Sequence, residues 1–256
     1  MRRKYIFRKQ KKLTLRGTKE SVDLDIEVFK NAIGLFDKKI HKLTETAEEL
    51  FATLGMRNLS AFVGELFVAS LAKSSAGLLV KNPHQDGYPD LLMMTDEGKK
   101  LFAGLVENMQ DKKPFSEFAT GGIEIKATCG SVPTPAVLSK KGLRRPDIGD
   151  QRAGFLTGYD WKAHHRETNN LVGIVWDFFD GVPTIVGLFF GSNLKKADWG
   201  KIVQPKKGGG RTTSVSIMTR YGIKKMYDGW VAVLDDQRYI DFFNKFNGGS
   251  NSIDRA

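Results

Sequence analysis

The sequence predicts an α/β fold, because strong helical patterns and strong strand patterns follow one another along one chain. Apolar residues recur every three to four positions from 23 to 54 and again from 58 to 73, which is the spacing of amphipathic helices. Residues 171–179 and 182–190 are two nearly continuous apolar runs joined by Asp180-Gly181, a hairpin turn signal. Runs without polar alternation are typical of strands covered on both faces, so this pair should lie at the centre of a sheet.

The other elements follow from the same periodicities and from turn residues. Within 23–54, Gly34 or Asp37 should divide the helical pattern in two, and Gly55 should end it. The remaining expected elements are strands at 78–80, 91–94, 123–127, 215–218 and 230–234, a turn at 82–87, and helices at 96–111 and 239–246.

Length and composition restrict the class of protein. The chain has 256 residues with no internal repeat and no linker, so we interpret residues 1–256 as a single domain. No apolar run approaches the roughly 20 residues of a membrane-spanning helix, and no apolar signal-peptide core is evident. Cys129 is the only cysteine, which rules out intrachain disulfides and cysteine-rich zinc sites. We therefore expect a cytoplasmic protein without a membrane partner.

Positive charge is concentrated at the start of the chain. The net charge is +11, and residues 1–20 hold nine Lys or Arg against one acid, Glu20. This basic N-terminal arm, which also carries aromatic and aliphatic residues, could lie along DNA phosphates. It could equally be a solvated tail or a basic edge strand at Lys12–Leu15.

The most informative stretch links two predicted strands. Pro89-Asp90 stands at the head of the apolar run 91–94, and residues 123–127 alternate apolar and polar side chains, as in a strand with one wet face. Side chains two positions apart on a strand share a face, so Glu124 and Lys126 should point the same way. If the two strands are neighbours, Asp90 approaches Glu124. Two carboxylates and one ammonium would then converge on one point.

Such a constellation suits metal-dependent phosphate chemistry. Mg²⁺ prefers hard oxygen ligands, commonly one or two carboxylates with water and substrate phosphate. A bound metal activates water and stabilises charge in the transition state. A lysine beside it can orient that water and lower its pKa.

Pro89-Asp90 followed by Glu124-Ile125-Lys126 resembles the PD-(D/E)XK motif of type II restriction endonucleases. The resemblance implies a restriction-endonuclease-like core, a mixed β-sheet flanked by α-helices. It also implies Mg²⁺, with Mn²⁺ able to substitute, held by Asp90, Glu124 and the backbone carbonyl of Ile125. Lys126 would position the attacking water. Glu65, on the helix before the Pro-Asp strand, could reach the metal, although it could equally be a surface residue.

The function implied is sequence-specific cleavage of double-stranded DNA, leaving a 5′-phosphate and a 3′-hydroxyl. One such site cuts one strand, so a homodimer with two-fold symmetry is the simplest way to cut a duplex. Alternatives are a DNA repair, recombination or resolvase nuclease with the same core, and a non-catalytic nucleic-acid-binding protein.

Two other interpretations of the motif remain. A rival pairing joins Asp147 with Asp160 and Lys162, but it lies in polar sequence without apolar alternation. In the second, Glu124 and Lys126 are solvated side chains of an edge strand.

Two basic segments are candidate DNA-contacting loops. Residues 131–152 contain three prolines and so should be irregular, and residues 195–225 hold nine Lys or Arg against Asp198. Lys and Arg contact phosphates and guanine edges, whereas Gln contacts adenine. The candidates are Lys140, Lys141, Arg144, Arg145, Gln151, Arg152, Lys206, Lys207 and Arg211. His164 and His165 are adjacent and so lack metal-ligand helix spacing; we expect them to contact solvent or DNA.

Overall fold

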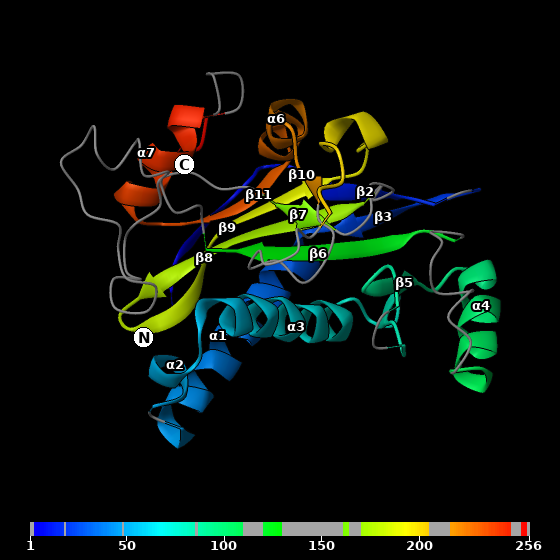
Figure 1. The fold of residues 1–256 in the computed structure, drawn as a ribbon, viewed down its shortest axis with the longest axis horizontal. Helices are drawn as coiled ribbons and strands as arrows, with labels where there is room; N and C mark the ends of the chain where they lie inside the picture. Colours follow the sequence, from blue (N-terminus) through cyan, green and yellow to red (C-terminus); the bar gives the residue numbers. More distant parts are fainter. Residues whose placement is uncertain are drawn as a thin grey trace.

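A mixed seven-stranded sheet forms the centre of the protein (Figure 1). The computed structural model describes residues 3–17, 19–47, 49–84, 87–109, 120–129, 161–163, 170–204, 216–246 and 252–254. Across the sheet the strands run β1 (Tyr5–Phe7), β11 (Trp230–Leu234), β9 (Val182–Gly191), β8 (Leu171–Phe179), β6 (Gly122–Thr128), β5 (Leu91–Met93) and β4 (Leu79–Lys81). The β6–β8 pair is parallel and the other pairs are antiparallel. The prediction of an α/β protein with a mixed sheet is therefore confirmed.

Helices cover both faces of this sheet. One face carries α1 (Ile26–Thr46), α2 (Leu50–Thr53) and α3 (Met56–Ser74), and the other carries α6 (Arg220–Asp228) and α7 (Gln237–Phe246) (Figure 1). The smaller elements are α4 (Asp96–Glu107), the 3₁₀ helix η2 (Lys196–Asp198), the strand pair β2 (Lys12–Arg16) and β3 (Ser21–Asp25), and the pair β7 (Lys162–Ala163) and β10 (Ser216–Ile217). None of the described helices is long and apolar enough to cross a membrane.

The first helix begins later than predicted and is not divided at the predicted break. Residues 21–25 form β3, since Leu24 is buried opposite Leu13 in the β2–β3 hairpin. The carboxylate of Asp25 then accepts a hydrogen bond from the Glu27 N–H and begins α1. The helix continues through Gly34 and Asp37, so the predicted break is wrong. Packing of the buried face outweighs the weak helix propensity of one glycine.

Other boundaries are close to those predicted. The predicted helix 58–73 is α3, the strands at 78–80 and 91–94 are β4 and β5, and the helix at 96–111 is α4, which ends at Glu107. The helical pattern ends directly before Gly55, as predicted, because α2 ends at Thr53 with Leu54 as its C-cap; Gly55 also precedes α3 as its N-cap.

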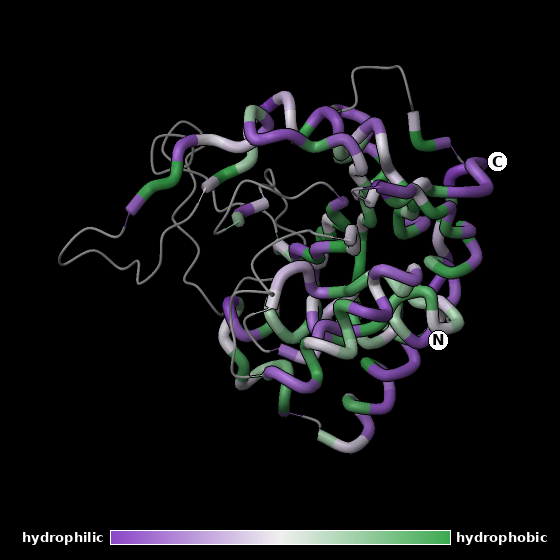
Figure 2. The backbone as a smooth tube through the Cα atoms, turned by 90° about the vertical axis from the view of Figure 1, so that its right-hand side faces the viewer, coloured by the Kyte–Doolittle hydropathy of each residue, from purple (hydrophilic) through white to green (hydrophobic). Residues whose placement is uncertain are grey.

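Each face of the sheet has its own hydrophobic core. The α1–α3 face gathers helix residues such as Phe29 and Phe67 with Ile174 and Trp176 of β8. The α6–α7 face gathers Met226 and Phe243 with Leu171 and Val175 of the same strand. The β8–β9 hairpin is buried from both sides, as its continuous apolar sequence predicts. Figure 2 shows hydrophobic segments inside the molecule and hydrophilic stretches along the outer helices.

The described part of the basic N-terminal arm belongs to the fold. β1 pairs with β11 at one edge of the sheet, and Lys12–Arg16 forms β2, so the edge-strand interpretation of Lys12–Leu15 is confirmed. Arg3 donates to the Phe179 carbonyl oxygen at 3.1 Å. The solvated-tail interpretation is wrong for residues 3–17, because strand pairing and buried Leu13 and Leu15 fix their conformation.

Candidate active site on strands β5 and β6

The predicted contact between Asp90 and the 123–127 strand is present. Asp90 directly precedes β5, which pairs antiparallel with β6 through Leu91 opposite Ile123. The Ile125 N–H donates a hydrogen bond to Asp90 Oδ2 at 2.7 Å. The pairing between β5 and β6 includes only two residue pairs, so beyond it the Asp90 carboxylate takes the place of a strand partner.

Glu124 and Lys126 share a face of β6 and form an ion pair through Glu124 Oε1 and Lys126 Nζ. The strand lies between β5 and β8, and the Glu124 residue is only 3% exposed. The interpretation as an edge strand with solvated Glu and Lys is therefore wrong. The predicted wet face is also wrong for Glu124, because this residue is buried.

The electrostatics of the site are those of two carboxylates sharing one ammonium. Burial raises the pKa of Glu124 to about 7, although the Lys126 ammonium opposes this rise. Burial also raises the pKa of Asp90, again against the attraction of Lys126. For Lys126, burial alone would lower the pKa, but the two carboxylates outweigh it and the pKa is raised. With all three groups ionised, the cluster carries one net negative charge.

One oxygen of Glu124 has no hydrogen-bond partner among the residues that the structure describes. This oxygen, Oε2, is buried, whereas Oε1 is bonded to Lys126. A buried carboxylate oxygen without a donor is costly, since the charge has lost its water without compensation. A cation or a water at this position would remove that cost.

Asn82 fixes the backbone around Asp90. Its backbone N–H donates to the Asp90 carbonyl oxygen at 2.9 Å, and its Nδ2 donates to the Pro89 carbonyl oxygen at 3.0 Å. Its Oδ1 accepts from the His84 N–H at 3.0 Å. Asn82 is buried, so these bonds form away from bulk water and hold the residues before β5 in one position.

Asn170 does the same for the start of β6. Its Nδ2 donates to the Gly122 carbonyl oxygen at 2.8 Å and to the Arg16 carbonyl oxygen at 2.7 Å. Its Oδ1 accepts from the Arg16 N–H at 3.0 Å, and its own carbonyl accepts from the Glu124 N–H at 3.0 Å. Asn170 is completely buried and joins the ends of β2, β6 and β8.

Sequence reasoning missed both asparagines. Their position at the ends of strand patterns is the only sequence signal, and asparagine is common there as a turn residue.

Gly122 allows the two strands to approach. Its φ is +143°, and a Cβ there would lie 2.2 Å from the Leu91 carbonyl oxygen and 2.6 Å from Pro89 Cγ. Only glycine fits such a position without displacing backbone. The glycine thus sets the separation between β5, which Asp90 directly precedes, and β6, which carries Glu124.

Glu65 lies at the margin of the site. It extends from α3 and pairs with Lys81 of β4 at 2.6 Å, with 61% of its side chain exposed. Its negative charge contributes to the raised pKa of Asp90, so the two carboxylates repel one another electrostatically. Its position fits both predicted roles, a surface residue and a carboxylate within electrostatic reach of the site.

The remaining predicted site residues lie outside the described residues. These are Lys140, Lys141, Arg144, Arg145, Gln151, Arg152, Lys206, Lys207 and Arg211, together with His164, His165, Asp147 and Asp160. Lys162 of the rival pairing is described and lies exposed on β7. In the described part of the chain, no three His, Cys, Asp or Glu residues gather as a potential metal site.

Comparison with known proteins adds no relative. No family model, curated protein or solved structure matches this chain.

Proposed function

We propose that the protein is a Mg²⁺-dependent endonuclease of restriction type that cuts double-stranded DNA. The observation that supports this most is the cluster at the junction of β5 and β6, in which Lys126 forms an ion pair with buried Glu124 and interacts electrostatically with half-buried Asp90. The mixed sheet flanked by helices is compatible with the restriction-endonuclease-like core that the Pro-Asp and Glu-Ile-Lys motif implies.

The donor set fits Mg²⁺. Glu124 offers the unpartnered Oε2, and Asp90 brings a second carboxylate. The N–H and C=O of a strand residue point to the same neighbour, so the Ile125 carbonyl faces the Asp90 side as its N–H does. Two carboxylates and one carbonyl, with water and phosphate, are a ligand count that Mg²⁺ accepts.

When bound, Mg²⁺ would stabilise charge on the phosphate and activate a water molecule. The protein groups have separate parts in this proposal. Asp90 and Glu124 supply negative charge that attracts the cation. Lys126, held by Glu124, presents an ammonium that can donate to the attacking water and keep it aligned with the phosphorus.

The test is cleavage of plasmid and phage DNA by purified protein with Mg²⁺. Asp90→Asn, Glu124→Gln and Lys126→Met should each lower cutting at least about a hundredfold, because each removes a group that acts on the transition state. Lys162→Met is the matched control and should cut normally. Normal cutting by Lys126→Met together with loss in Lys162→Met would refute the assignment.

The metal is tested in the same assay. Mg²⁺ or Mn²⁺ should support cutting, and Ca²⁺ should support binding with little cutting because it takes more ligands at longer distances. Cutting that persists in excess chelator would exclude the metal mechanism. Discrete fragments would distinguish a restriction enzyme from a repair or resolvase nuclease, and two chains per duplex in sedimentation would support the homodimer.

A further inference from the structure

A basic surface covers the outer side of the α6 layer. We define the α6 surface as the exposed side chains of residues 193–204 and 216–225, which include η2, β10 and most of α6. These segments contain one acidic residue, Asp198, against six cations. The cations are Lys195, Lys196, Lys201, Arg220, Lys224 and Lys225.

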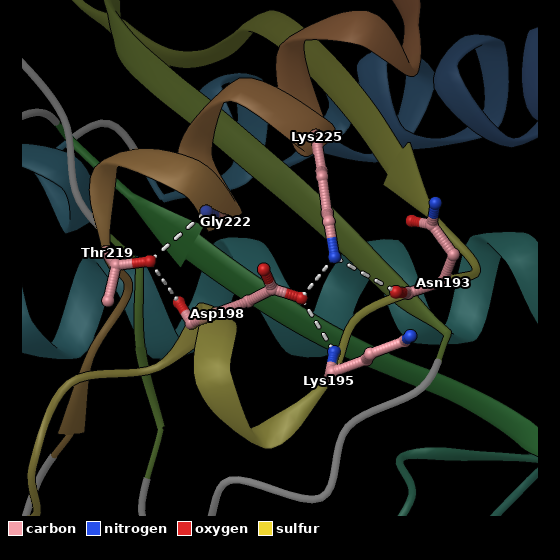
Figure 3. A network of polar contacts seen from close by, with 6 residues as sticks. All are labelled: Asn193, Lys195, Asp198, Thr219, Gly222 and Lys225. Carbon is pink, nitrogen blue, oxygen red and sulfur yellow. Dashed lines mark hydrogen bonds and ion pairs between the residues drawn. The ribbon is translucent and has the colours of Figure 1, made fainter.

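Asp198 holds the segments of this surface together through hydrogen bonds (Figure 3). Its buried carboxylate accepts hydrogen bonds from the Lys195 N–H at 2.7 Å and from Lys225 Nζ at 2.6 Å. Its carbonyl accepts from Thr219 Oγ1 at 3.0 Å, and Thr219 in turn accepts from the Gly222 N–H at 3.3 Å and caps α6. The one acid therefore joins η2 to α6 and is neutralised by Lys225.

The α6 surface lies over the sheet face that carries the candidate active site. In the parallel β6–β8 ladder, Lys126 lies opposite Gly173, and partners in a ladder share a face. A Cβ on Gly173 would meet the Trp161 ring at 2.6 Å and Met226 Cε of α6 at 3.0 Å. Thus α6 packs directly on the strand position next to Lys126, whereas α1 and α3 cover the opposite face (Figure 1).

Tyr221 is unusually exposed for an aromatic residue. It lies in the first turn of α6 between Arg220 and Gly222, is 80% exposed, and is one turn away from Lys224. Exposed Ile202 and Val203 lie on the same surface. An exposed tyrosine between Arg220 and Lys224 can offer its hydroxyl or its ring to a ligand.

We propose that the α6 surface binds the phosphate backbone of duplex DNA, with Tyr221 donating its hydroxyl to a phosphate. This inference rests on the proposed function for the choice of DNA as ligand. The cations supply counterion release, and the surface lies on the outer side of the helix that packs over the sheet face of Lys126. Phosphate contacts orient a duplex without reading its sequence, so this surface binds DNA of any sequence.

The experiment measures binding of a short labelled duplex in Ca²⁺ by fluorescence anisotropy over a range of salt. A quadruple variant replaces Lys196, Lys201, Arg220 and Lys224 with Gln. If all four contact phosphates, the slope of log affinity against log salt falls by about 3.6, at about 0.9 for each contact. Changing the three lysines to Arg instead should preserve the wild-type slope.

The matched control removes three lysines and one arginine from the other side of the sheet. Lys38, Lys42, Arg57 and Lys73 are exposed on α1 and α3, and their replacement with Gln should leave the slope close to wild type. The proposal for the α6 surface would be overturned if the slope fell equally in both quadruple variants. It would also be overturned if the variant of Lys196, Lys201, Arg220 and Lys224 kept the wild-type slope. Binding is measured without cutting. If the duplex binds through this surface but is never cleaved, only the proposed nuclease activity is refuted.

Tyr221 needs its own comparison. Tyr221→Phe and Tyr221→Ala should weaken duplex binding to the same extent, on the order of fivefold, because both lose the hydroxyl donor. If Phe retains full affinity while Ala loses it, ring stacking is the contact. Tighter binding of single-stranded DNA that depends on this ring would overturn the duplex assignment.

Discussion

Replacing Asn170 with leucine should destabilise the protein strongly. Leucine has a similar size, so it removes the three side-chain hydrogen bonds without opening a large cavity. The Gly122 carbonyl is buried, and leaving it unpaired costs about 1–3 kcal/mol. The two Arg16 backbone groups are partly buried and should cost about 0.5–1.5 kcal/mol each. The free energy of unfolding should therefore fall by roughly 2–6 kcal/mol.

The assay is urea unfolding followed by tryptophan fluorescence, at neutral pH and without metal. Asn244→Leu is the matched control. It loses two bonds, from Nδ2 to the Ile253 carbonyl at 3.0 Å and from the Ile253 N–H to Oδ1 at 2.8 Å, far from β6. It should cost about 1–3 kcal/mol. At equal folded fraction, only the Asn170 variant should lose DNA cutting, because only Asn170 holds the residues around Glu124.

A loss below about 1 kcal/mol in Asn170→Leu would refute this account of the bonds, given the penalty for a single buried unpaired group. Equal effects of Asn170→Leu and Asn244→Leu on cutting would show that Asn170 contributes stability alone.

Two further predictions concern stability. Burial raises the pKa of Asp37 from 3.8 to about 6, although Arg3 and Tyr5 oppose this rise, so the folded state favours the neutral carboxyl. The stabilisation that the neutral Asp37 carboxyl gives to the folded state is complete below pH 3.8 and is lost as the pH rises through about 6. Asp37→Asn should thus match wild type at pH 3.5 and be more stable by up to about 3 kcal/mol at pH 8, and urea unfolding that shows equal differences at both pH values would contradict this. Gly122→Ala should cost more than about 2 kcal/mol of unfolding free energy because of its positive φ and the 2.2 Å approach to the Leu91 oxygen. Gly104→Ala, in open space on α4, should instead gain about 0.5–1 kcal/mol, and similar effects at both glycines would argue against steric control of the β5–β6 approach.

Local patterns were sufficient for the main elements, whereas the pairing that forms the site follows from them only if the two strands are neighbours, as they are in the structure. The alternation of residues 123–127 predicts which side chains share a face, and this depends only on backbone geometry. The continuous apolar sequence of 171–190 predicts a central hairpin for an equally local reason, because each residue must be buried on one face or the other. These inferences need no knowledge of which distant segments meet.

Long-range packing explains what could not be predicted. β1 pairs with β11 across more than two hundred residues, and no local signal in Tyr5–Phe7 specifies that partner. The packing of Trp161 and α6 on Gly173, the residue opposite Lys126, involves segments that come later in the chain than β6. The role of Asn170 depends on three strand ends meeting at one point. Such contacts are properties of the assembled fold, whereas a residue type and its neighbours describe only one segment.

The energetics of Glu124 and Lys126 favour a functional role over a structural one. A buried ion pair seldom stabilises a fold relative to apolar side chains of the same size, because desolvation offsets the attraction. Here the balance is less favourable still, since Asp90 adds a second negative charge and no described residue donates a hydrogen bond to Oε2 of Glu124. Apolar residues at both positions would continue the core between the sheet and α6–α7, because both side chains lie on that face. Perturbed carboxylates beside a lysine are typical of sites that bind or activate a ligand, and a divalent cation would neutralise the excess charge that folding leaves uncompensated.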